Sequence, residues 1–143
     1  MARSKYPRQK SYTALEQALH VCSRYEGFKH KITGINTVRI LGKLQPIAFS
    51  KPYEIEVQYQ LGKYPKVRII SPAIDKNAPH MFSENKICTF YPESINWTRE
   101  MKIADTIIPW VSDWIFHYES WLVTGIRKGK PDPRHLRRRE SVA

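Results

Sequence analysis

Cysteine is scarce in this sequence: only Cys22 and Cys88 occur in 143 residues. Two thiols do not make a disulfide framework, so a reduced, cytoplasmic protein is expected. The five histidines are scattered, and no cysteine or histidine pair has the spacing of a zinc site. We therefore expect no bound metal and no other cofactor.

Long apolar runs are also missing. No segment approaches the roughly 18 apolar residues that a membrane-spanning helix needs, so no membrane partner is expected. The start, MARSKYPRQK, has no apolar segment behind it and does not resemble a secretory signal. A glycine-rich phosphate loop is absent as well. The chain is therefore not expected to activate a substrate with ATP; a separate activating enzyme would do so, unless the substrate is already reactive.

Acidic residues are few at the two ends of the chain, so most of the net charge of +11 lies at these ends. Residues 1–10 hold four basic residues and no acid, and residues 127–143 hold seven basic residues and two acids. The remainder therefore carries only +2. Basic ends around a nearly neutral body are typical of solvated or docking tails, so nucleic-acid binding is not expected as the main function. The expected organisation is a basic tail over 1–10, one domain over 11–126 and a second basic tail over 127–143.

What is present is strong periodicity. Residues 13–25 are predicted to form an amphipathic helix that begins with a capping box of Thr13 and Glu16 and ends at Gly27. Its predicted apolar stripe is Leu15, Ala18, Leu19 and Cys22.

Four strands are predicted next, over residues 28–33, 37–42, 53–61 and 66–70. The third, YEIEVQYQL, alternates strictly between apolar and polar residues, which predicts a solvent-exposed face with Glu54, Glu56, Gln58 and Gln60. Short connections and clean alternation are typical of an antiparallel meander.

A long helix over residues 98–124 is expected to cover the other face of the sheet, because apolar and aromatic residues recur there at helical spacing. Thr98 is its predicted N-cap and Gly125 its stop, and Pro109 is expected to kink or split it. The order of helix, meander and helix places the chain in the α+β class.

Between the fourth strand and this helix lies an irregular segment of about 27 residues, and segments of this length are usually functional or disordered. Residues 64–90, YPKVRIISPAIDKNAPHMFSENKICTF, resemble the active-site region of ubiquitin-conjugating enzymes, which have the UBC fold. Residues 65–68 match the start of that family's fourth strand, Pro79 matches the proline of its His-Pro-Asn motif, and Cys88 matches its catalytic cysteine. Ala78 and His80 replace the histidine and the asparagine of the motif.

A variant of this pattern fits better. The Pro-His pair ahead of Ile-Cys, followed by WTREMKIADTIIPWVSDWIFHYESWLVTG, is similar to the small prokaryotic ubiquitin-conjugating-like proteins of CBASS antiphage operons. The resemblance implies a UBC-like fold over about residues 13–125. It also implies thioester chemistry on the C-terminal tail of a cGAS-like nucleotidyltransferase, which is the expected partner and acyl donor.

Within this resemblance Cys88 is the expected nucleophile, since a thiolate is strongly nucleophilic and its thioester stays reactive toward amines. His80 is an oxyanion donor, a general base or a structural anchor of the loop. Pro79 would set the loop, and Asn77 and Asn85 either cap turns or assist the chemistry. Cys22, on the helix stripe, is expected to be a small core residue.

Two other functions stay open at this point. One is a non-catalytic UBC-like scaffold that binds and regulates the synthase, with Cys88 uninvolved. The other is a nucleic-acid-binding domain that uses its basic tails, whose binding would show a steep salt dependence and would be lost on deletion of residues 127–143.

Overall fold

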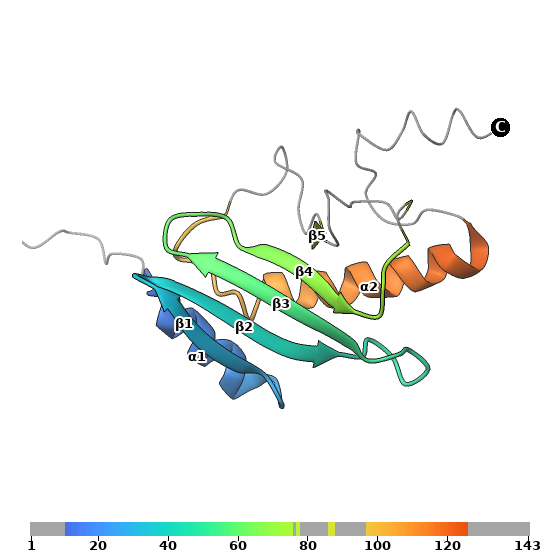
Figure 1. Cartoon of the computed structure of the whole chain (residues 1–143), viewed down its shortest axis with the longest axis horizontal. Helices are drawn as coiled ribbons and strands as arrows, with labels where there is room; N and C mark the ends of the chain where they lie inside the picture. The colour runs from blue at the N-terminus through green and yellow to red at the C-terminus, as the bar shows by residue number, and fades with distance from the viewer. Residues whose placement is uncertain (1–10, 76, 78–85, 88–96, 126–143) are drawn as a thin grey trace, which may run out of the picture.

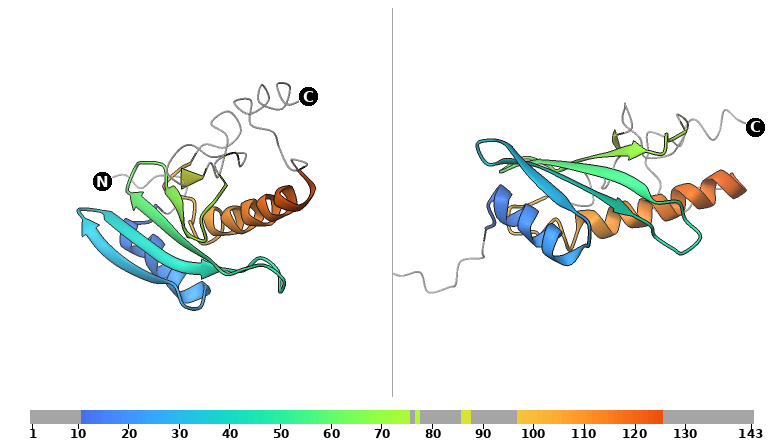
Figure 2. Two further views of the ribbon diagram at one scale, coloured as in Figure 1. Left: turned by 45° about the vertical axis from the view of Figure 1, so that its right-hand side comes forward. Right: turned by 60° about the horizontal axis from the view of Figure 1, so that its bottom comes forward.

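A computed structural model describes residues 11–75, 77, 86–87 and 97–125. The elements in chain order are α1 (Ala14–Arg24), β1 (Lys29–Gly34), β2 (Thr37–Leu44), β3 (Tyr53–Gln60), β4 (Lys66–Ser71), β5 (Lys86–Ile87) and α2 (Ile107–Thr124). The strands form one sheet in the order β1-β2-β3-β4-β5, and every neighbouring pair is antiparallel. Both helices lie against the same face of this sheet (Figures 1 and 2). The predicted α+β class and UBC-like layout are confirmed.

Helix α1 begins as predicted but buries a different face. Thr13 and Glu16 form the predicted capping box, with Glu16 N–H donating to Thr13 Oγ1 at 3.1 Å and Thr13 N–H donating to Glu16 Oε1 at 3.1 Å. The predicted stripe is wrong in part, because Leu15 and Leu19 are 40% and 47% exposed. The buried positions are Ala14, Gln17, Ala18 and Val21.

Gln17 explains this difference. Its side chain is fully buried, and it donates from Nε2 to the Met101 carbonyl at 2.6 Å and accepts the Ile103 N–H at Oε1 at 2.9 Å. A buried side-chain amide is stable in a core when both its oxygen and its nitrogen are hydrogen-bonded, whereas the polar character of glutamine predicts a solvent-facing position.

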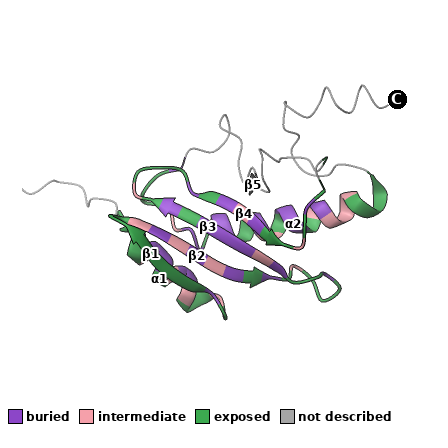
Figure 3. Ribbon diagram, in the orientation of Figure 1, coloured by how far each residue is buried: buried purple, intermediate pink, exposed green. Residues whose placement is uncertain are grey.

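The central strands supply the sheet side of the core. Along β2 and β3 buried residues alternate with more exposed ones, as Figure 3 shows. The buried face of β3 consists of Tyr53, Ile55, Val57 and Tyr59, as the alternation predicts. Glu56 breaks the pattern, since it is fully buried although it belongs to the opposite face. The expectation that Glu56 is solvent-exposed is therefore wrong.

Helix α2 starts later than predicted and is not broken at Pro109. Residues 98–106 form turns, so Thr98 is not its N-cap; Thr106 occupies that position. Pro109 lies in the first turn of α2, where its missing N–H has no partner in a helix anyway, so the expected kink is wrong. Gly125 ends the helix as predicted, with φ +69° and its N–H donating to the Trp121 carbonyl at 2.7 Å.

The core lies between the sheet and the helix layer. Apolar side chains of α1, β2, β3, β4 and α2 join in a single buried cluster that includes Val21, Ile40, Ile55, Ile69 and Ile115. Within the described ranges, neither helix has the length and hydrophobicity needed to cross a membrane.

Candidate active site

Most of the predicted site residues fall outside the described part of the chain. Cys88, His80, Pro79 and Asn85 lie outside the described residues, and Asn77 lies within them. The described chain nevertheless approaches this segment at three places, which are residues 74, 75 and 77, strand β5 and Trp97. These three places form the frame of the candidate site.

Strand β5 is the part of the frame next to the predicted nucleophile. It pairs antiparallel with β4, with Ile87 opposite Val67 and Lys86 opposite Arg68. The main chain one residue before Cys88 is therefore held at the β4 edge of the sheet (Figure 1). The sequence did not predict this strand, because two residues are too short to show a period of two.

The start of the segment is tied to α2. Ile74 is buried, and the next residue, Asp75, donates its N–H to Tyr118 Oη at 3.0 Å. The Tyr118 ring is itself buried and stacks on Trp114 at 5.2 Å with an interplanar angle of 7°. The chain thus enters the segment from a point fixed by the second half of α2.

Asp75 and Asn77 form a turn at this point. Asn77 N–H donates to Asp75 Oδ1 at 2.8 Å, which is the hydrogen bond of an Asx-turn. Asp75 therefore has the turn-forming role that is its commonest use, and Asn77 is exposed. A part for Asn77 in the chemistry stays a prediction.

Trp97 is the anchor on the far side. It is 9% exposed, and its ring meets that of Tyr59 edge to face at 5.5 Å and 73°. The turns that follow are fixed by Gln17, through Met101 and Ile103, and by Tyr25 Oη, which donates to the Ala104 carbonyl at 2.8 Å. The chain leaves the segment on a point held by β3 and α1 together.

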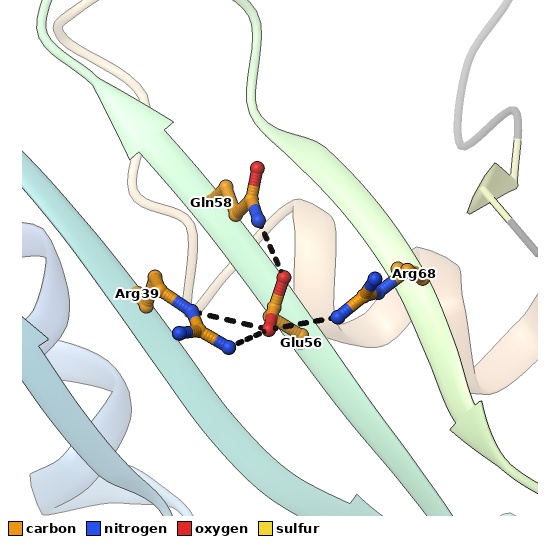
Figure 4. Close-up of polar contacts among 4 residues, drawn as sticks. All are labelled: Arg39, Glu56, Gln58 and Arg68. Atoms are coloured by element: carbon orange, nitrogen blue, oxygen red, sulfur yellow. Dashed lines mark hydrogen bonds and ion pairs between the residues drawn. The ribbon is translucent and has the colours of Figure 1, made fainter. Parts of the chain in front are cut away.

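A buried carboxylate links the central strands β2, β3 and β4. Glu56 Oε2 accepts from Arg39 Nε at 3.1 Å and from Arg68 Nη2 at 3.3 Å, and Arg39 Nη2 forms a further ion pair with the same oxygen. Glu56 Oε1 accepts from Gln58 Nε2 at 2.6 Å. Figure 4 shows Arg39 and Arg68 reaching Glu56 from the two flanking strands.

The electrostatics of this cluster follow from its geometry. Burial alone would raise the pKa of Glu56, but hydrogen bonds from Arg39 and Gln58 and the charges of Arg68 and Arg39 outweigh it, so the pKa lies below its ordinary value. Glu56 is therefore ionised at neutral pH. Sequence reasoning missed the cluster, since only the register that sets Glu56 opposite Arg68 brings its members together.

The second cysteine lies at the other edge of the molecule. Cys22 is on α1, which packs on β1 and β2, whereas β5 is at the opposite end of the strand order. Its Sγ lies 3.5 Å from His30 Nδ1, and burial raises the pKa of the thiol. A raised pKa disfavours the reactive thiolate, so Cys22 fits the predicted role of a small packing residue.

Metal ligands do not gather in the part of the chain that the structure describes, where no group of three His, Cys, Asp or Glu side chains is placed to hold an ion. In a comparison with protein families, the family described as Type II CBASS E2 protein matches residues 17–134. This range contains every predicted site residue. No curated protein matches the chain.

Proposed function

This chain belongs to the Type II CBASS E2 family, and from that premise we propose that it is a ubiquitin-conjugating-like acyltransferase that carries an acyl group as a thioester on Cys88. The proposed donor is the C-terminus of a cGAS-like cyclic-oligonucleotide synthase, and the acyl group passes to an amine in antiviral defence. One observation carries the proposal: the family match spans Cys88. Strand β5, which holds the chain at the sheet edge one residue before Cys88, is compatible with it.

Loading is a substitution at an activated carbonyl. The Cys88 thiolate attacks the carbonyl carbon of the activated donor C-terminus, the C–S bond forms, and the activating group leaves with its electron pair. Because the sequence holds no glycine-rich phosphate loop, either a separate activating enzyme supplies this donor or the donor is already reactive.

Transfer releases the thiolate again. The acceptor amine attacks the thioester carbonyl, the C–N bond forms, and the tetrahedral intermediate collapses as the C–S bond breaks. The amine proton passes to a base or to water. His80 is the candidate for that base, for the donor that stabilises the oxyanion, or for the anchor of the loop. Pro79, Asn77 and Asn85 are proposed to support the loop.

A scaffold that binds and regulates the synthase without chemistry is the alternative function. In the family that the chain resembles, members without catalysis usually lack the cysteine. The presence of Cys88 at the matched spacing therefore supports the enzyme over the scaffold.

The test uses the chain with its operon synthase and activating enzyme on non-reducing gels. Wild type is expected to give an adduct that thiols cleave. Cys88→Ser is expected to give a more stable ester adduct, because an ester resists thiols. Cys88→Ala is expected to give none, and Cys22→Ala serves as the matched control that behaves as wild type. An adduct that persists in Cys88→Ala would contradict the mechanism.

A further inference from the structure

One face of the sheet is left open by both described helices (Figure 2). We call it the open face; its side chains follow from the burial alternation and from the strand register, since directly opposed residues point to the same side. They are Lys29, Lys31, Thr37, Arg39, Leu41, Lys43, Glu54, Glu56, Gln58, Gln60, Lys66, Arg68 and Ser71.

Positive charge is concentrated on this face. Four lysines and two arginines stand against two glutamates, which gives +4 for the open face. Several acids lie outside this face, for example Glu16 on α1 and Asp113 and Glu119 on α2. The low net charge of the body therefore conceals a positively charged face, which the fold assembles from separate strands.

Glu56 makes part of this face rigid. It holds Arg39 and Arg68 on a single oxygen, and the two arginine side chains remain 40% and 42% exposed. A guanidinium that is already fixed loses less conformational freedom when a carboxylate binds it, and arginine is enriched among the residues that dominate binding energy. The cluster therefore presents preorganised donors to an anionic partner.

The composition favours a protein over a nucleic acid. Leu41 is apolar and half-buried, Gln58 and Gln60 are neutral, and Glu54 is an acid that would repel a phosphate backbone. The strand positions of the open face carry no aromatic residue on which a base could stack. A folded surface with net negative charge can instead meet each of these groups with a different side chain.

The open face extends to β4, the strand that pairs with β5 of the candidate-site frame. Arg68 pairs with Lys86 of β5, which stands two residues before Cys88. A partner docked on this face would lie beside β4, the strand that pairs with the two residues ahead of Cys88, and tethering the partner to the chain would raise the effective concentration of its C-terminus.

We propose that the open face docks an acidic patch on the folded body of the synthase whose C-terminus Cys88 carries. This inference rests on the proposed function for the identity of the partner. The docking itself is non-covalent and is separate from the thioester step.

The test measures binding of the purified synthase to the full chain carrying Cys88→Ala, which removes covalent capture. Lys29→Glu with Lys31→Glu, both exposed on edge strand β1, is expected to weaken binding by about tenfold or more and to flatten its salt dependence. Lys51→Glu with Lys63→Glu is the matched control, since it makes the same charge change at exposed loop positions outside the open face. That control is expected to change the affinity by less than about threefold.

A second variant tests the preorganised guanidinium. Arg39→Lys keeps the charge but loses the fork that Glu56 holds, and it is expected to weaken binding several-fold where simple charge attraction would leave binding unchanged. We call the chain with Lys29→Glu and Lys31→Glu the β1 variant. Equal affinities of the synthase for the β1 variant and for its control would overturn the docking proposal, and so would the absence of synthase binding by the Cys88→Ala chain. The proposal would also be overturned if the β1 variant lost binding to duplex DNA while it still bound the synthase normally.

The two proposals fail in different ways. If wild type forms the thiol-sensitive adduct but the β1 variant binds the synthase normally, the docking surface is wrong and the thioester mechanism stands. If the β1 variant loses binding and no adduct forms with wild type, docking stands and the chain is a scaffold.

Discussion

Glu56 is fully buried although it lies on the face of the sheet that neither described helix covers. Arg39, Arg68 and Gln58 make this possible, because they supply hydrogen bonds to both of its oxygens. Without them, burial of a carboxylate would raise its pKa and cost several kcal/mol. Glu56 thus determines how the two arginines are held.

The effect of Glu56 on stability is predicted to depend on pH. Because its folded pKa is lower than its unfolded value of about 4.3, the stabilisation is complete above that value and is lost as the pH falls through the folded pKa. Glu56→Gln is expected to lower the free energy of unfolding by about 1–3 kcal/mol at pH 7 and by less in acid, measured by urea denaturation.

Glu54→Gln is the matched control for this measurement, since Glu54 stands two residues away on the same strand face and is only half-buried. It is expected to change stability by less than about 0.5 kcal/mol. Equal losses for the two variants at pH 7, or a Glu56→Gln loss that stays constant into acid, would contradict the assigned role of Glu56.

At the scale of elements, the sequence predicted most of the fold because its local patterns are strong. The capping box of α1, the four long strands and the Gly125 stop are each set by a few neighbouring residues. The burial of Gln17 and the presence of β5 were not predicted, because contacts with residues distant in the sequence determine both. Gln17 faces the core because Met101 and Ile103 satisfy it, and β5 exists because β4 offers a free edge.

Gln17 provides a test of such a distant contact. Gln17→Leu keeps the size of the side chain but leaves the Met101 carbonyl and the Ile103 N–H without their partner, so it is expected to cost about 2–4 kcal/mol. The reverse exchange, Leu19→Gln at an exposed position of the same helix, is expected to cost less than about 0.5 kcal/mol. If Gln17→Leu were as harmless as Leu19→Gln in thermal or urea denaturation, the amide would not be the link between α1 and residues 101–103.

Pro109 provides a test of where α2 begins. Because it lies in the first turn and is exposed, Pro109→Ala is expected to change the free energy of unfolding by less than about 1 kcal/mol. Ser112→Pro, three residues further into the helix, is expected to cost about 3 kcal/mol or more. A large gain in stability for Pro109→Ala would instead indicate that this proline interrupts a longer helix.

At the scale of the whole molecule, the family and the α+β layout were evident from sequence, because residues 64–90 and 97–125 combine several matching features. The basic open face was not evident, since its charges come from β1, β2 and β4 and meet only through the strand register. The roles of Cys88 and His80 stay predictions, and so do the domain boundaries at residues 10 and 126.

Deletion of the basic C-terminal tail distinguishes two functions, an acyl carrier and a nucleic-acid-binding domain. Deletion of residues 127–143 is expected to leave adduct formation with the synthase intact, because the proposed chemistry resides at Cys88. Any binding to nucleic acid through the tails is expected to fall with the loss of seven basic residues. Loss of the adduct on this deletion, in a variant that still folds, would contradict the assignment of the chemistry to the body of the protein.

Cys88 is proposed to carry the C-terminus of the synthase as a thioester. Intact-mass spectrometry of the reaction of wild type with the synthase and its activating enzyme tests it most directly. The expected species has the summed mass of both chains less one water and is cleaved by hydroxylamine, and its peptide map joins the C-terminal residue of the synthase to Cys88. A linkage mapped to a lysine or to Cys22 in the loaded intermediate, or no covalent species at all, would contradict it.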